Sequence, residues 1–161
     1  GIRRTHEFIV VCFKDKAHTT LHPIHQPVWN ETGYTNVVKP LETVIDGMGT
    51  NASAKDELEE ILGDRTLFAT PKPVRLIEEL IRAASRKDSV VLDFFAGSGT
   101  TGHATMKLNA EDGGHRRFIL VTNNESNICR RVTIPRIMKA KAICQCKEEI
   151  QVETFMERSV I

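Results

Sequence analysis

The fold of this chain is decided by one stretch, Val90-Val91-Leu92-Asp93-Phe94-Phe95-Ala96-Gly97-Ser98-Gly99-Thr100-Thr101-Gly102. It begins as a short apolar run, which is typical of a buried strand, and continues as a glycine-rich turn. Ala104 and Leu108 follow at helical spacing, so the pattern predicts a strand, a tight loop and a helix. Gly97 and Gly99 tolerate the positive φ that such a loop requires. The backbone amides of the helix's first turn then predict an electropositive pocket for a small polar ligand.

Two ligand classes compete for this pocket. The string 97–102 fits the G-x-G-x-x-G pattern of dinucleotide-binding sites, so an NAD-binding Rossmann domain is one alternative. A P-loop is excluded because no Lys-Ser or Lys-Thr pair follows the glycines. Asp93 argues against a dinucleotide, because a carboxylate at the strand end would repel a pyrophosphate. It suits a positively charged group, such as the ammonium in the methionine part of S-adenosylmethionine.

The string from Asp93 to Thr101 resembles the cofactor-binding motif I of amino-methylating DNA methyltransferases of the β class. Three further stretches resemble the modification subunits of type III restriction–modification systems: 108–121, 49–53, and Thr70-Pro71-Lys72-Pro73 with the helix after it. The resemblance covers residues 47–140. It implies an α/β chain with a partial Rossmann-like methyltransferase fold, in which helices flank parallel strands, and it implies S-adenosylmethionine as the cofactor.

The resemblance also implies which residues contact the cofactor. Thr70 and Lys72 are candidate contacts to the methionine carboxylate, although helix capping would equally explain them. Glu125 follows the second strand, 118–121, where an acid can accept hydrogen bonds from ribose hydroxyls; an exposed strand-end carboxylate is the alternative. The full expected set is Asp93, Phe94, Phe95, Ala96, Gly97, Ser98, Gly99, Thr100, Glu125, Thr70 and Lys72.

We expect two parts in the chain. Residues 1–48 contain an apolar run at 6–13, which resembles the motif VIII strand, and a stretch at 14–48 that is expected to be irregular, with a reduced or absent target-recognition region. Residues 49–161 are expected to form the α/β part that binds S-adenosylmethionine. Within it, helices are predicted from Ser53 to Gly63, after Thr70, and from Thr133 to about Cys144, with a further strand at 150–155.

Charged residues on two of these helices are expected to face solvent. The first group is Glu78, Glu79, Arg82 and Arg86, opposite an apolar face that includes Val74, Ile77 and Ile81. The second is a basic cluster of Arg130, Arg131, Arg136, Lys139 and Lys141, for which contact with a DNA backbone is the alternative.

Composition narrows the function classes. The net charge is only +1, so it gives no support for a chain that binds DNA by itself. The four cysteines and the histidines at 18, 22 and 25 fit no standard metal pattern, so no metal is expected. A reduced, cytoplasmic protein is the simple interpretation, because no signal peptide or membrane-spanning run is present.

Amino-methylating enzymes of this class hold the flipped base with an Asp/Asn/Ser-Pro-Pro-aromatic loop, and no Pro-Pro pair occurs in this sequence. We therefore expect the C-terminal, cofactor-binding portion of an adenine-N6 DNA methyltransferase, with no catalytic residue of its own and no activity alone. Alternatives are a cytosine-N4 methyltransferase fragment, a non-catalytic interaction module and an NAD-binding domain. Expected partners are DNA through the complete enzyme, a missing N-terminal catalytic part, a restriction subunit and a second copy of the chain.

Overall fold

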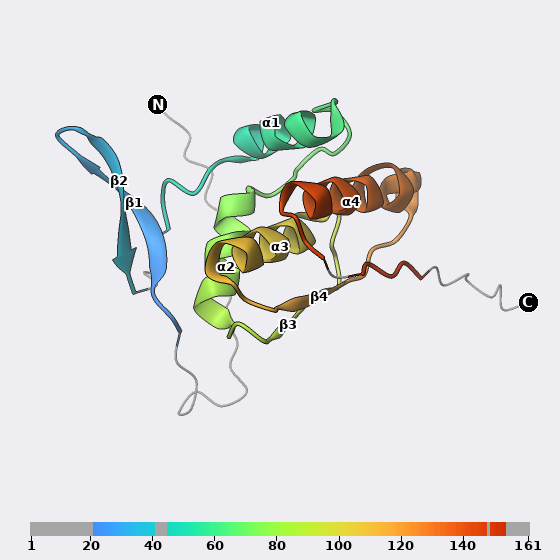
Figure 1. Cartoon of the computed structure of the whole chain (residues 1–161). Helices are drawn as coiled ribbons and strands as arrows, with labels where there is room; N and C mark the ends of the chain where they lie inside the picture. Colours follow the sequence, from blue (N-terminus) through green and yellow to red (C-terminus); the bar gives the residue numbers. More distant parts are fainter. Residues whose placement is uncertain (1–20, 41–44, 148, 154–161) are drawn as a thin grey trace, which may run out of the picture.

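The computed structural model describes residues 21–40, 45–147 and 149–153, and it shows an α/β arrangement (Figure 1). The predicted strand at 6–13 lies outside these residues. The elements in chain order are β1 (Ile24–Asn30), β2 (Gly33–Lys39), α1 (Asn51–Leu62), α2 (Val74–Ala84), β3 (Val90–Asp93), α3 (Thr100–Asp112), β4 (Arg117–Leu120), a short 3-10 helix (Glu125–Asn127), a π-helical turn (Cys129–Thr133) and α4 (Ile134–Ile143).

The centre of the fold is the unit β3–α3–β4. Strands β3 and β4 are parallel, with Val90 opposite Arg117 and Asp93 opposite Leu120. A parallel pair needs a crossover, and α3 supplies it. The predicted order of strand, glycine loop, helix and second strand is therefore confirmed.

Within the described residues this sheet has two strands, and three helices cover one of its faces. Val91 points into a cluster formed by α2 and α3, which includes Val74, Ile81 and Leu108. Phe118 and Leu120 pack against a second cluster, formed by α3 and α4. Figure 1 shows α1 lying beyond α4, on the side away from the strands. The core therefore lies between one face of the sheet and the helices.

The other face of the sheet is exposed. Its apolar side chains are Val90, Leu92, Ile119 and Val121, which are between 44% and 53% exposed. A continuous apolar run predicts a strand that is buried on both faces. In the described part of the chain, only one of the two faces is buried.

The region expected to be irregular contains a β-hairpin, so that prediction was wrong for residues 24–39. Strands β1 and β2 pair in antiparallel fashion, with Ile24 opposite Lys39 and Asn30 opposite Gly33. The prolines and the turn-forming residues suggested a loop, but β-branched residues such as Val37 and Val38 favour a strand. Ile24 is fully buried beside Ala83 of α2, which fixes the hairpin to the helical layer.

Helix α1 begins at Asn51, two residues before the predicted start at Ser53. Thr50 caps it, and Thr50 and Ser53 exchange hydrogen bonds in a capping box. Gly63 ends the helix with φ of 82°, as the sequence predicted. Glu57 of α1 in turn accepts a hydrogen bond from the amide of Val74 at 3.0 Å, so α1 caps the start of α2.

Two acidic residues of α2 are buried, which corrects the solvated face predicted for them. Glu78 is 3% exposed and accepts a hydrogen bond from the Lys107 ammonium at 2.8 Å. Glu79 is 6% exposed and accepts hydrogen bonds from the Arg82 guanidinium and from the backbone amide of His25. These partners belong largely to other elements, so helical spacing within α2 gave no sign of them.

In the described residues after β4, a 3-10 helix and a π-helical turn precede the α-helix α4. A π-helical turn leads into α4, whose extent agrees with the predicted helix. The predicted strand at 150–155 is not present over 150–153, and its last two residues lie outside the described ranges. None of the helices in the described part of the chain has the length and apolar character needed to cross a bilayer.

Candidate functional site

The loop between β3 and α3 depends on two glycines. Gly97 has φ of 50° and Gly99 has φ of 79°, in the left-handed region. A Cβ atom on Gly97 would lie 3.0 Å from the ring of Phe68, and one on Gly99 would lie 3.3 Å from a methyl group of Thr133. Backbone conformation and space therefore both favour glycine here, and the predicted positive φ values are confirmed.

Hydrogen bonds attach this loop to its neighbours. The amide of Val121 donates to the carbonyl of Asp93 at 2.8 Å, and the amide of Ala96 donates to the carbonyl of Val121 at 3.1 Å. The hydroxyl of Thr133 donates to the carbonyl of Gly97 at 2.6 Å. The ends of β3 and β4 therefore lie side by side.

The carboxylate of Asp93 has a fixed orientation. Its Oδ1 accepts from the amide of Phe95 at 3.0 Å, and its Oδ2 accepts from the hydroxyl of Thr101 at 2.6 Å. A carboxylate has about four acceptor positions, so these two bonds leave capacity for a ligand. Asp93 lines a small cavity, which is the place where that capacity can be used.

This small cavity has a volume of about 220 Å³ and lies between the glycine loop and the residues that precede α2. The hydroxyl of Thr100 donates to the carbonyl of Lys72 at 3.3 Å and so joins the two sides. Eight of the eleven predicted site residues line the cavity: Thr70, Lys72, Asp93, Phe95, Ala96, Gly97, Ser98 and Thr100.

A larger cleft of about 880 Å³ adjoins the small cavity, and Phe68, Phe95 and Gly97 line both. Phe94 and Glu125 line only the larger cleft. Glu125 is exposed there, and its carboxylate accepts a hydrogen bond from the side-chain amide of Asn123 at 3.4 Å. Gly99, the buried N-cap residue of α3, lines neither space.

The small cavity combines two opposite electrostatic features. Asp93 brings a negative charge to it. Helix α3 begins at Thr100 without a side-chain cap, so its first-turn amides carry the partial positive charge of a helix N-terminus. Such a cavity is complementary to a ligand group that carries an ammonium and a carboxylate close together.

Comparison with known proteins identifies the family. The model of the N6/N4 methylase family, described as DNA methylase, matches residues 1–134. The chain belongs to this DNA methylase family. The resemblance to DNA methyltransferases inferred from the motifs is thereby confirmed.

Individual relatives place this DNA methylase chain beside modification enzymes. It is 49% identical over 88 residues to the type III restriction–modification enzyme StyLTI Mod subunit of Salmonella typhimurium, covering 55% of this chain and 13% of that protein. It is 49% identical over 76 residues to the EcoPI Mod subunit of Escherichia phage P1, covering 47% and 12%. The type II methyltransferase M.KpnI of Klebsiella pneumoniae is 45% identical over 71 residues, covering 44% and 17%. The chain thus spans less than a fifth of each of these three relatives.

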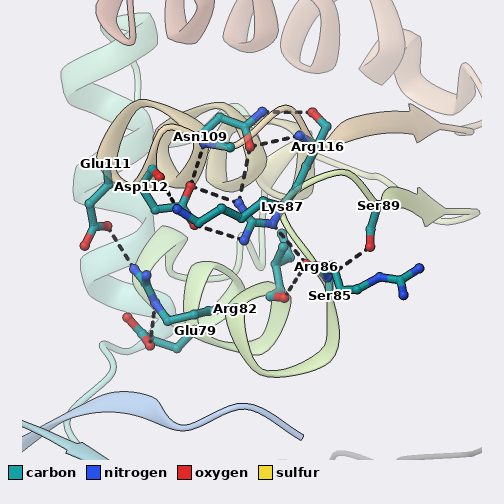
Figure 2. A network of polar contacts seen from close by, with 12 residues as sticks. Glu79, Arg82, Ser85, Arg86, Lys87, Ser89, Asn109, Glu111, Asp112 and Arg116 are labelled. Carbon is teal, nitrogen blue, oxygen red and sulfur yellow. Dashed lines mark hydrogen bonds and ion pairs between the residues drawn. The ribbon is translucent and has the colours of Figure 1, made fainter. Parts of the chain in front are cut away.

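The methylase stretch 108–121, which resembled type III modification subunits, serves a structural purpose (Figure 2). The side chain of Arg116 is 3% exposed, and its guanidinium bonds both carboxylate oxygens of Asp112 at 3.1 and 3.0 Å. It also donates to the hydroxyl of Ser85 at 3.1 Å. Asn109 exchanges two hydrogen bonds with the backbone of Arg116. These contacts join the ends of α2 and α3 to the start of β4.

A second set of contacts extends this network across the surface of the methylase fold. Arg82 bonds Glu79 of its own helix at 3.2 Å and Glu111 of α3 at 2.9 Å, and Lys87 donates to the carbonyl of Asp112 (Figure 2). Arg82 is therefore an inter-helix bridge rather than a solvated side chain. The network holds the end of the β3–α3–β4 unit that lies away from the glycine loop.

Several residues that line the two cavities were not predicted. Phe68, Ile77 and Thr101 line the small cavity, and Asp64 and Arg131 line the larger cleft. Thr101 had a signal in the sequence, because it stands in the first turn after the glycine loop. The others come from segments whose position depends on tertiary packing. The residues that the structure describes contain no group of three or more side chains suited to hold a metal ion.

Proposed function

We propose that this chain is the cofactor-binding portion of a site-specific DNA methyltransferase that transfers a methyl group from S-adenosylmethionine to N6 of adenine. Membership of the DNA methylase family supports the reaction class. Similarity to the Mod subunits of type III restriction–modification enzymes supports a modification enzyme of that type. The assignment to adenine rests on this similarity.

The observation that carries the proposal is the small cavity between the glycine loop and the start of α2. On one side is Asp93, whose carboxylate suits the ammonium group of the methionine part. The uncapped start of α3 and the residues Thr70 and Lys72, which precede α2, suit the carboxylate of the same part. A pyrophosphate would meet Asp93 with repulsion, so this arrangement favours the methionine group over NAD.

The adjoining cleft suits the adenosine part of the cofactor. Phe68, Phe94 and Phe95 supply aromatic surface. Glu125, the first residue of the 3-10 helix after β4, supplies a carboxylate that can accept hydrogen bonds from ribose hydroxyls. The two spaces adjoin, which a cofactor with a charged end and an adenosine end requires.

The contribution of this chain to methyl transfer is positioning. S-adenosylmethionine, when bound, supplies the sulfonium methyl group. Asp93, held by the amide of Phe95 and the hydroxyl of Thr101, fixes where an ammonium group binds. Fixing one reactant in this way lowers the entropic part of the barrier. We propose no catalytic residue within this chain.

Contact with the target base is assigned to the complete enzyme. The loop that holds a flipped adenine in this class contains a Pro-Pro pair, which this sequence lacks. We propose that an N-terminal catalytic part supplies it, and that a restriction subunit and a second copy of the chain are further partners. DNA incubated with this chain and radiolabelled S-adenosylmethionine should gain no label, and clear incorporation would overturn this division of roles.

Binding of S-adenosylhomocysteine tests the cofactor site directly. We expect isothermal titration to show binding by the wild-type chain and at least tenfold weaker binding by Asp93→Asn. Asp88→Asn is the matched control, because the side chain of Asp88 is 81% exposed and lies at the other end of β3. NAD should bind more weakly than S-adenosylhomocysteine. A folded wild-type chain that binds only NAD, or nothing, would contradict the proposal.

A further inference from the structure

The residue that sequence reasoning placed on a solvated face, Arg136, is fully buried beneath the glycine loop. It belongs to the first turn of α4 and is 0% exposed. Burial lowers the pKa of its guanidinium to about 10, and the charge of Glu57 acts in the opposite direction. Arg136 therefore carries a positive charge at neutral pH, and that charge lies in the interior.

The guanidinium points at two hydroxyl groups of the small cavity. Its Nη1 donates to Oγ of Ser98 at 3.0 Å and to Oγ1 of Thr100 at 2.9 Å. Both residues are at least 95% buried, and both line the cavity. Each hydroxyl oxygen accepts from the guanidinium, so its own hydrogen must point elsewhere. The hydroxyl of Thr100 donates to the carbonyl of Lys72. In the part of the chain that the structure describes, the hydrogen of Ser98 can point toward the Thr100 oxygen at 3.2 Å or into the cavity.

Among the described residues, no carboxylate is in contact with the positive charge of Arg136. No acidic side chain in the described ranges lies within ion-pair distance, and its Nε and Nη2 atoms have no hydrogen-bond partner there. Glu57 is instead bonded to the amide of Val74. The neighbouring His103 is buried and neutral at pH 7, because burial, with the charges of Arg136 and Lys107, lowers its pKa to about 4. A buried, unpaired cation next to a cavity favours an anion in that cavity.

We propose that Arg136 is a positioning residue for the carboxylate of the cofactor: it polarises the hydroxyls of Ser98 and Thr100 and makes this side of the small cavity a carboxylate site. The inference rests on the proposed cofactor site and adds a residue that does not touch the ligand. Ser98 donates its hydrogen toward the carboxylate, and the charge behind it strengthens that bond.

Two ligands that differ only in the carboxylate test this role. The first is S-adenosylhomocysteine, and the second is its decarboxylated analogue, which keeps the amine and the adenosine part. The wild-type chain should prefer the first ligand. In Arg136→Met, the dissociation constant for S-adenosylhomocysteine should rise about tenfold, while that for the analogue changes less than about twofold. Arg130→Met, which removes an exposed positive charge nearby, is the control and should keep the preference.

The outcomes separate this inference from the proposed function. A wild-type chain that binds neither ligand refutes the cofactor site itself. A wild-type chain that binds both equally, or an Arg136→Met chain that loses affinity for both equally, refutes only the role of Arg136. If Arg136→Met does not fold, Ser98→Ala provides the test, because it leaves Arg136 in place and should still lower the preference for the carboxylate. Full preference in a folded Ser98→Ala chain would overturn the proposal.

Discussion

The hydroxyl of Thr101 donates to Oδ2 of Asp93 at 2.6 Å, while the amide of Phe95 donates to the other oxygen at 3.0 Å. Thr101 stands in the first turn of α3 and Asp93 ends β3. The bond therefore connects the two elements on either side of the glycine loop. It fixes the plane of the carboxylate before any ligand is present, which reduces the entropy cost of binding.

Replacement of Thr101 by Val tests this connection. The variant keeps the shape of the side chain and removes the hydroxyl donor. We expect the free energy of unfolding to fall by about 1 kcal/mol and the affinity for S-adenosylhomocysteine to decrease, because Asp93 loses one of its two fixed partners. Thr101→Ser keeps the hydroxyl and should retain binding. Equal affinities in the Val variant and the wild type would show that the orientation of Asp93 does not matter.

Gly97 offers a second test, in which Gly63 is the matched control. Both glycines have positive φ, so an alanine at either position should cost about 1 kcal/mol of stability. A Cβ atom at Gly97 would lie 3.0 Å from the Phe68 ring, whereas a Cβ atom at Gly63 would meet nothing within 4 Å. We expect only Gly97→Ala to weaken S-adenosylhomocysteine binding, because it displaces a ring that lines both cavities. Titration of both variants decides this, and equal affinities would contradict it.

His103 should make the stability of the chain depend on pH. It is 8% exposed, and its pKa is lowered to about 4, first by burial and then by the charges of Arg136 and Lys107. An unfolded chain binds a proton at this position near pH 6.5, whereas the folded chain does so only near pH 4. The contribution of His103 to the free energy of unfolding is therefore fully present above pH 6.5. It is lost as the pH decreases toward 4, by about 3 kcal/mol over that range.

Urea unfolding between pH 4 and pH 7 measures this dependence. In His103→Gln the difference in unfolding free energy between pH 7 and pH 4 should shrink, because the group that protonates on unfolding is absent. His115→Gln, at an exposed histidine, is the control variant. If His103→Gln and the wild type show the same pH dependence of the unfolding free energy, that dependence comes from other groups.

Local patterns predicted the central unit of the fold and much of the candidate site. The apolar run, the two glycines and the helical spacing after them act over a few residues, so 90–121 could be interpreted without tertiary information. The site residues before α2 could be predicted only from the family resemblance, which placed them beside the loop. Local patterns and the resemblance together predicted eleven residues, and eight of them line the small cavity.

The errors concern contacts between segments far apart in the chain. The partner of Glu78 is Lys107, and the partners of Arg136 are Ser98 and Thr100, so a helical pattern could not show that these charges are buried. The hairpin at 24–39 was missed because prolines and turn residues outweighed its β-branched positions. Phe68 was missed because no local signal places this ring against Gly97.

The exposed face of the β3–β4 sheet gives the last prediction. Leu92 is 50% exposed, whereas its neighbour Val91 packs on the helical cluster that includes Val74 and Leu108. Leu92→Thr should therefore change the unfolding free energy by less than about 0.5 kcal/mol, and Val91→Thr should lower it by about 1–2 kcal/mol, because it places a hydroxyl against an apolar cluster. Urea unfolding of both variants measures the difference. Equal losses would mean that the outer face is covered in solution, and light scattering would then show whether a second copy covers it.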